Sequence, residues 1–296
     1  MEYRTDLAME RMVHPGCLGE GVVVQTMQDG KAEITWVRVN TASAAKRIGK
    51  AKGTYWTMTH PELPFLTPAE RIEIAKQVAQ TLRIMIPAKG DILVLGLGNR
   101  RMTADALGDH VVSGILVTRH LQPEGHGLRN VCAISPGVLG VTGLETAELA
   151  SGIVERLRPA AVVVIDALAA METSHIATTI QVTDAGIHPG SGVGNHRKGI
   201  NKELLHVPVI ALGIPMVVYA STIVRDTLQQ IISKDGGEDD AQAMAEYLAG
   251  QAESDLVVTP RNIDELVAGL SDMLALAINS ALQPSYSIDE LTHYLH

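Results

Sequence analysis

Two aspartates in this sequence follow short apolar runs and could act together as an acid and a base. Asp105 comes shortly after the run Ile92–Leu95, and Asp166 directly follows the run Ala161–Ile165. Such runs predict buried strands of a parallel sheet. If the two strands are neighbours, both carboxylates face the crevice at their carboxyl ends. Two close carboxylates tend to share one proton, so one can activate water while the other protonates a leaving amine, as peptide hydrolysis requires.

Each aspartate also has a structural interpretation. Gly96–Asn99 predicts a tight exit from the first strand, and Thr103 is a candidate N-cap for a helix over 104–116. Asp105 would then lie in the first helical turn, where it could simply complement the helix dipole. An Asp-Ala pair after a strand is also a common start of a loop. Spacing alone therefore leaves the catalytic and structural interpretations open.

The segment Asp184–Asn195 holds four glycines and one proline in 12 residues. Its backbone could line a peptide-binding cleft, or it could form only an irregular turn. His188 could ligate a metal or orient a substrate, although a lone loop histidine more often does neither. The candidate cleft residues are His188, Gly190, Ser191, Gly192 and Asn195.

Other catalytic patterns find no support in the sequence. The stretch Gly96–Arg101 begins like a dinucleotide-binding loop, but Arg101 stands where the third glycine is needed, and the expected acidic residue about 20 positions on is missing. The chain also has no GxSxG, HExxH or recognisable Cys-His pattern. We therefore expect no cofactor.

The elements that must position these residues alternate between strands and helices. Residues 22–27 and 32–39 are β-type runs joined through Asp29-Gly30, which predicts an N-terminal hairpin at about 22–39. Thr67–Glu70 predicts a capping box, with the helix ending at about Ile86, before Pro87. The alternation predicts one α/β domain, with a mostly parallel sheet covered by helices on both faces and extended by the hairpin. Further strands are expected at 130–134, 178–182, 207–212 and 256–259, and further helices at 144–158, 221–232 and 263–282.

A basic stretch follows the hairpin. Residues 41–53 contain Lys46, Arg47, Lys50 and Lys52, with Arg38 just upstream. A solvated loop explains this composition. The alternative is a positively charged lip that steers acidic segments of a substrate.

Composition limits the classes of function. The 296 residues carry a net charge of −9, which argues against direct nucleic-acid binding. Cys17 and Cys132 have no metal-site spacing and are expected to be reduced thiols. No signal peptide and no membrane-spanning run is apparent, so we expect a soluble, cytoplasmic protein without a membrane partner.

At these motifs the sequence resembles the germination proteases of spore-forming bacteria, which degrade small acid-soluble spore proteins. The resemblance implies an α/β fold like that of the hydrogenase-maturation endopeptidases, with Asp105 and Asp166 as the essential carboxylates of an atypical aspartic-type endopeptidase. It also implies a zymogen that assembles as a homotetramer in the spore core. The segments that carry the resemblance are 4–10, 96–99 with 103–108, 164–168, 184–195, 210–226 and the C-terminal helix.

Two alternatives remain beside that function. In the maturation proteases the equivalent positions bind a metal together with a histidine, so a metal-assisted endopeptidase would use Asp105, Asp166 and His188. A catalytically inactive relative would only bind spore proteins, although the presence of both aspartates argues against this.

The resemblance also implies processing at the N-terminus. The family's substrates are cut before a bulky apolar residue that is followed by Ala, a variable residue and Glu, and Asp6-Leu7-Ala8-Met9-Glu10 matches this motif. We therefore expect residues 1–6 to form a propeptide and 7–296 a single protease domain, with cleavage between Asp6 and Leu7 that is faster at mildly acidic pH. A polar terminal segment is expected to be loosely held. Only three residues precede Arg4-Thr5-Asp6 here, fewer than the family usually has.

Overall fold

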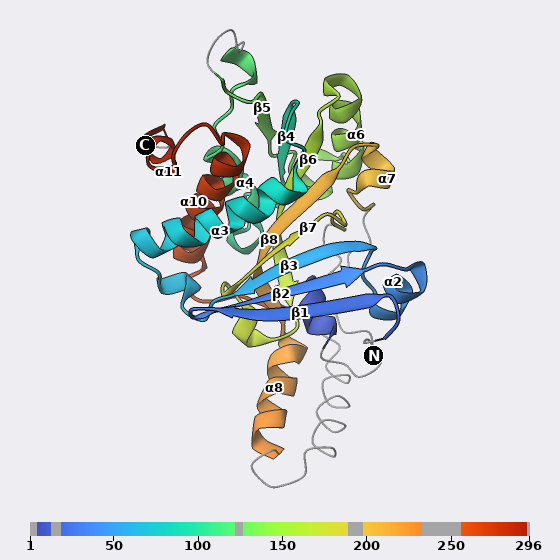
Figure 1. Ribbon diagram of the computed structural model, residues 1–296. Helices are drawn as coiled ribbons and strands as arrows, with labels where there is room; N and C mark the ends of the chain where they lie inside the picture. The colour runs from blue at the N-terminus through green and yellow to red at the C-terminus, as the bar shows by residue number, and fades with distance from the viewer. Residues whose placement is uncertain (1–4, 13–18, 122–126, 189–197, 233–255, 295–296) are drawn as a thin grey trace.

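The computed structural model describes residues 5–12, 19–121, 127–188, 198–232 and 256–294 (Figure 1). They form one nine-stranded sheet in the order β1-β2-β3-β7-β8-β6-β4-β5, with β9 paired to β8. The pairs β8-β6, β6-β4 and β4-β5 are parallel, whereas the pairs from β1 through β8, and β8 with β9, are antiparallel. The strands are β1 Val22–Asp29, β2 Ala32–Val39, β3 Gly53–Thr59, β4 Ile92–Gly96, β5 Val131–Ile134, β6 Ala161–Ala170, β7 Thr179–Thr183, β8 Val209–Tyr219 and β9 Val257–Val258.

Helices cover both faces of the parallel part, as the sequence predicts. The α-helices are α1 Ala8–Arg11, α2 Ala42–Ile48, α3 Pro68–Met85, α4 Leu107–Ser113, α5 Leu139–Thr142, α6 Thr146–Leu157, α7 Lys202–Leu205, α8 Ala220–Ile232, α10 Ile263–Leu282 and α11 Ile288–Tyr294. Short 3-10 turns are η1 Leu63–Phe65, η2 Thr103–Asp105, η3 Arg119–Leu121 and η4 Thr173–His175. Figure 1 shows α3, α4 and α10 on one side of the sheet and α6 and α7 on the other.

Alternation along the central strands divides the core into two layers. In β6, Val163 and Ile165 face the larger core beneath α3, α4 and α10, while Val162 and Val164 face the smaller core beneath α6 and α7. Asp166 therefore shares the face of Val164, with α6 and α7. A strand buried on both faces must be apolar almost throughout, which makes a carboxylate there exceptional.

The N-terminal hairpin is confirmed as β1 and β2, which pair antiparallel across Asp29 and Ala32. It joins the same sheet through β3, a strand that the sequence analysis missed. The basic stretch 41–53 is likewise not simply a loop, because α2 occupies Ala42–Ile48. Thr41 caps this helix by accepting a hydrogen bond from the Ala44 N–H, and Ala44 and Ile48 form its buried face.

Helix α3 shows the predicted capping box, in which Thr67 and Glu70 cap each other's backbone N–H groups. The expected strand end at Ile165 is wrong, because β6 continues through Asp166 to Ala170 against β8. The expected cap is also wrong. Thr103 begins η2 instead, and the helix α4 starts only at Leu107.

Helix α10 is the one described helix that is long and apolar enough to cross a membrane. It packs against α3 and α4, and 78 % of its most apolar stretch is buried inside the molecule. These contacts identify it as a core helix.

Candidate functional site

The two aspartates lie where β4 and β6 run side by side. Gly96, the last residue of β4, pairs with Ile165 of β6, which confirms that the two strands are neighbours. Asp166 is the next residue of β6 and is 6 % exposed. Asp105 closes the turn η2 after β4 and is half-buried.

A chain of close contacts connects the backbones around the two residues. The Leu97 N–H donates to the Ile165 carbonyl at 2.8 Å. The neighbouring Gly98 lies so close to the Asp105 carbonyl that a Cβ would come within 1.8 Å of it, at a φ of +104°. Turn η2 packs against both β6 and β8. Both aspartates thus belong to one compact region at the end of β4.

Each aspartate has a specific local environment. The Asp105 Oδ2 accepts a hydrogen bond from the Asn99 N–H at 2.8 Å, which ties the turn to the loop that leaves β4. Asp166 stands opposite Gly213 of β8. A side chain at Gly213 would come within 2.5 Å of the Asp166 carbonyl and 2.7 Å of Leu168. The space beside Asp166 and Leu168 therefore has no room for a side chain at position 213.

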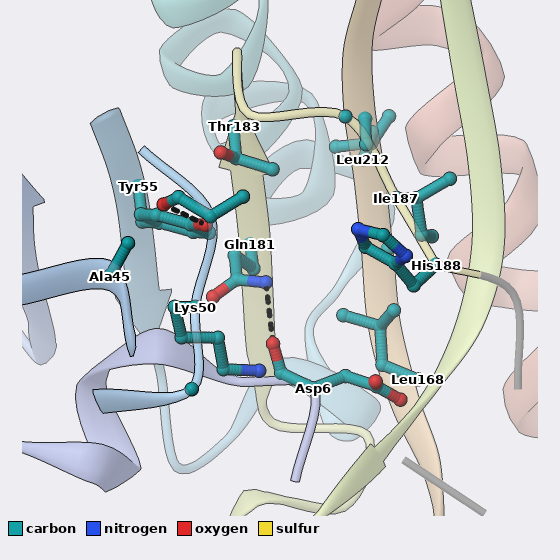
Figure 2. Close-up of a pocket in the computed structure, with 15 residues that line it drawn as sticks. Asp6, Ala45, Lys50, Tyr55, Leu168, Gln181, Thr183, Ile187, His188 and Leu212 are labelled. Carbon is teal, nitrogen blue, oxygen red and sulfur yellow. Dashed lines mark hydrogen bonds between the residues drawn. The ribbon is translucent and has the colours of Figure 1, made fainter. Parts of the chain in front are cut away.

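A cavity of about 370 Å³ is lined by Leu168 of β6, the second residue after Asp166 (Figure 2). Leu168 and Gly213 form part of its wall, which connects it to the neighbourhood of Asp166. In Figure 2, Lys50 and His188 lie on opposite sides of the cavity, with Gln181 and Asp6 between them. The remaining lining residues come from α2 and the loop after it, from β3, β7 and β8, and from Gly186 and Ile187.

Lys50 is the main positive charge of this cavity. Its ammonium donates to the Thr5 carbonyl at 2.7 Å. Burial lowers the pKa of Lys50 to about 8, although the negative charges of Asp6 and Glu10 act in the opposite direction. Burial also raises the pKa of the Tyr55 hydroxyl, which donates to the Ala51 carbonyl at 2.8 Å. Lys50 therefore belongs to the site rather than to a solvated loop.

Residues 5–12, called the N-terminal segment below, run past the cavity, and Asp6 forms part of its wall. The expectation that this segment is loosely held is wrong for these residues. Asp6 pairs with Ala169 of β6: its N–H donates to the Ala169 carbonyl and its carboxylate accepts from the Ala169 N–H, both at 2.9 Å. The Gln181 amide donates to the Asp6 carbonyl at 3.0 Å and accepts from the Ala8 N–H at 2.8 Å. The segment is therefore bound through its backbone, as a peptide would be.

Leu7 supplies the apolar part of this contact. Its side chain is fully buried and packs with Leu168 and Ala170 of β6 and with Val218 of β8. Asp6 and Leu7, predicted to flank the cleaved bond, thus lie along the same strand as Asp166. Ala169 is three residues beyond Asp166, or about 10 Å at about 3.3 Å per residue of strand.

The glycine-rich segment begins beside the cavity. Ile187, near the start of the segment, and Ile200, five residues after its end, exchange backbone hydrogen bonds of 2.9 and 2.7 Å. His188 is exposed, and its ring covers Gly199, where a Cβ would lie 2.5 Å from it. The other candidate cleft residues, Gly190, Ser191, Gly192 and Asn195, lie outside the described residues.

The alternative metal site requires three side chains that converge on one ion. Among the residues that the structure describes, no three His, Cys, Asp or Glu side chains converge in a way that could hold a metal ion. Asp105, Asp166 and His188 are all described, so they do not form such a group.

Sequence reasoning missed several residues that contact the N-terminal segment. Gln181 interrupts the apolar run of β7 and is 6 % exposed, and a buried amide within a strand is a signal that it has a specific partner. Glu10 and His175 carried no such signal, because nothing in their local sequence indicates that they meet.

Comparisons with known proteins identify the family of this chain. Residues 10–252 match the family model described as germination protease. The germination protease of Clostridium acetobutylicum is 39 % identical and the alignment covers 99 % of each chain. That of Caldanaerobacter subterraneus is 38 % identical over 99 % of this chain and 98 % of its own, and that of Bacillus cereus is 33 % identical over 94 % and 91 %.

Among solved structures, a [NiFe] hydrogenase maturation protease from Thermococcus kodakarensis matches with a TM-score of 0.30 and 17 % identity, over 59 % of this chain and 99 % of its own. That likeness is too weak to carry an argument. The family match and the relatives that align over almost their whole length do carry one: the chain belongs to the germination protease family.

Proposed function

We propose that this chain is an endopeptidase that cuts small acid-soluble spore proteins at germination, with Asp105 and Asp166 as its acid-base pair. The observation that carries the proposal is the binding of the chain's own Asp6–Ala8 segment by hydrogen bonds to Ala169, on the strand that bears Asp166, and to Gln181 of β7. A groove that holds a peptide beside two carboxylates has the two parts that a peptidase needs.

The two carboxylates differ in ways that suit different tasks. The hydrogen bond from Asn99 supports a charged Asp105, which would act as the base that takes a proton from water. Asp166 would hold the proton that the pair shares and give it to the leaving amine. After the bond is cut, Asp105 is protonated and Asp166 is charged. Proton exchange with water then restores the starting state of the pair.

The wider assignment forms part of the same proposal. The chain would be made as a zymogen whose residues 1–6 are removed, would assemble as a homotetramer and would act inside the spore core. The motif match at residues 6–10 and the occupied groove support the zymogen. Light scattering on the purified chain tests the tetramer.

The acid-base pair is tested with Asp105→Asn and Asp166→Asn. Asparagine keeps the shape of the side chain and, at 105, an oxygen that can accept from Asn99, but it cannot exchange a proton. We expect each variant to lose at least roughly 100-fold in kcat for spore protein, the lower end of what a general acid or base contributes. Thermal unfolding should remain nearly unchanged.

The matched control is Asp109→Asn on α4, whose carboxylate lies 4.0 Å from Arg100 at the surface. This variant should retain its activity. Near-normal turnover by either Asp105→Asn or Asp166→Asn would refute the assignment. Activity that is lost with a strong chelator and restored by zinc would favour the metal-assisted alternative. Binding of spore protein by the wild-type chain without any cleavage would favour the inactive relative.

A further inference from the structure

The side chain of Glu10 lies in a separate pocket beyond the cavity, at the end of β6. One carboxylate oxygen accepts from the Met171 N–H at 2.8 Å and from the Thr5 hydroxyl. The other accepts from the Glu172 N–H at 3.0 Å and lies 2.7 Å from Nδ1 of His175. Three of these four donors belong to the body of the protein and one to the N-terminal segment.

This pocket is built around a carboxylate. Glu10 is 1 % exposed and His175 is 9 % exposed, so the pair is removed from water. A buried ion pair is rarely more stable than well-packed apolar residues of the same volume, so anchoring the segment does not require one. The arrangement does select for a carboxylate. Buried donors that converge on one point lose their hydrogen bonds when a side chain without an acceptor binds there, so such a side chain binds more weakly.

The position of the pocket relates it to the peptide groove. Asp6 and Ala8 are held by Ala169 and Gln181, Leu7 fills its apolar pocket, and Glu10 follows three residues after Leu7. The body of the protein thus offers, in order, hydrogen bonds from Ala169 and Gln181, an apolar pocket and a carboxylate pocket. Together they fit a peptide that is extended up to a bulky apolar residue and then turns into a helix, as α1 does, which places a glutamate three positions later in the carboxylate pocket.

We propose that Met171 N–H, Glu172 N–H and His175 form a specificity subsite for a substrate glutamate, and that Glu10 is the chain's own occupant of it. The inference rests on the proposed peptidase function, because it names what that site selects. A substrate must displace the N-terminal segment before it can bind. The subsite distinguishes glutamate from its nearest analogues: aspartate is one methylene too short to reach the donors, and glutamine turns an N–H₂ toward other N–H groups.

The first experiment measures selectivity in the full chain. Decapeptides with the sequence of residues 3–12 and with Glu, Gln or Asp at the position of Glu10 are compared by kcat/KM. We expect wild type to prefer Glu by roughly tenfold or more, since charged hydrogen bonds contribute about 1.5–3 kcal/mol. His175→Leu should reduce the preference to below about threefold, while His175→Asn, which keeps one N–H donor, should retain part of it.

The matched control is His60→Asn, a histidine of similar burial at 8 % exposed, whose ring accepts from the Glu62 N–H and not from the groups that bind Glu10. It should leave the preference for Glu unchanged. If wild type cuts the Glu and Gln peptides equally well, or if His175→Leu keeps the full preference, the subsite is refuted while the peptidase function stands. If wild type cuts neither the peptides nor spore protein, the proposed function fails, and the inference is then decided by binding.

The second experiment measures binding without cleavage, in full-length Asp105→Asn. A fluorescent Glu peptide should bind at least roughly tenfold more tightly after Glu10→Ala is added, because the internal competitor has lost its carboxylate. The Gln peptide should show no such gain. Glu20→Ala, at an exposed position outside the pocket, is the control and should change neither affinity. Equal gains for both peptides, or no gain for either, would overturn the inference.

Discussion

Asp166 depends on the residue that faces it across the sheet. Gly213 has no side chain, and a Cβ there would press on the Asp166 carbonyl and on Leu168. We expect Gly213→Ala to lower the free energy of unfolding by about 1–3 kcal/mol, the usual cost of overpacking a core, and to reduce kcat. Urea unfolding and a spore-protein assay measure the two effects.

Gly152 provides a control, because the same substitution there should raise the free energy of unfolding. It lies within α6, where an added Cβ would meet nothing within 4 Å, so Gly152→Ala should raise stability by about 0.5–1 kcal/mol through helix propensity. A destabilising effect of the same size at both positions would show that the contact at Gly213 is not the cause.

His175 makes stability depend on pH. Burial lowers the pKa of His175, but the hydrogen bond and charge of Glu10, together with the charges of Glu172 and Glu33, outweigh it and hold the pKa above its ordinary value. The folded state therefore binds the proton more tightly than the unfolded state. The resulting stabilisation is complete below the unfolded pKa of about 6.5 and is lost as pH rises through the folded pKa.

Urea unfolding of wild type and His175→Asn at pH values well below and well above the titration tests this linkage. The free energy of unfolding of wild type should exceed that of the variant by a larger margin at the acidic pH than at the alkaline pH. A stability difference that grows with pH would contradict the sign of the shift.

At the scale of helices and strands, the sequence predicted the elements that are marked by a short local pattern of residues. The hairpin followed from Asp29-Gly30 between two β-type runs, and α10 was predicted with its observed bounds. Helix α2 was missed because its basic residues suggested a solvated loop, although Thr41 with Ala44 and Ile48 marks a cap and an apolar face. β6 runs past Asp166 because its small residues pair with β8 through a shift in register after Leu168, which no local pattern reveals.

The candidate site was predictable to the same extent. Both aspartates could be assigned to the region at the carboxyl end of β4, because β4 and β6 are parallel neighbours, although β6 itself continues past Asp166. The hydrogen bond between Asn99 and Asp105 and the contacts of the N-terminal segment could not be predicted. Gln181 lies 175 residues from Asp6 in the chain, and only the folded sheet brings them together.

The capping box of α3 offers a test at this scale. Thr67→Ala removes the hydroxyl that caps the Glu70 N–H, and should lower the free energy of unfolding by about 1 kcal/mol. Thr67→Ser retains the hydroxyl and should cost little. Thermal unfolding of both variants distinguishes the cap from a general effect of substitution, which would lower both equally.

At the scale of the whole molecule, residues 5–12 and the central sheet form one unit. Asp6 and Leu7 bind along β6, so cleavage between them would remove residues 1–6 and leave Leu7 at the end of an otherwise intact chain. We expect mass spectrometry to show a product that begins at Leu7, formed faster after a shift to about pH 5.5. Asp105→Asn should not form it.

The pH effect has two opposing parts. Protonation of His175 strengthens the hold on Glu10, so it opposes the acceleration in acid that we expect from a shared proton on the aspartates. Persistence of Met1 in a preparation that degrades spore protein would show that residues 1–6 are not an inhibitory propeptide.

The two candidate carboxylates are attached to parts of the molecule with very different freedom to move. Asp166 belongs to a central strand paired with β8, and such strands exchange their amide hydrogens only when the whole domain opens. Asp105 ends a three-residue 3-10 turn in a connection, the kind of segment that opens locally at low free-energy cost. Any adjustment that brings the pair into working geometry would therefore be made by the turn, while the strand serves as the fixed reference.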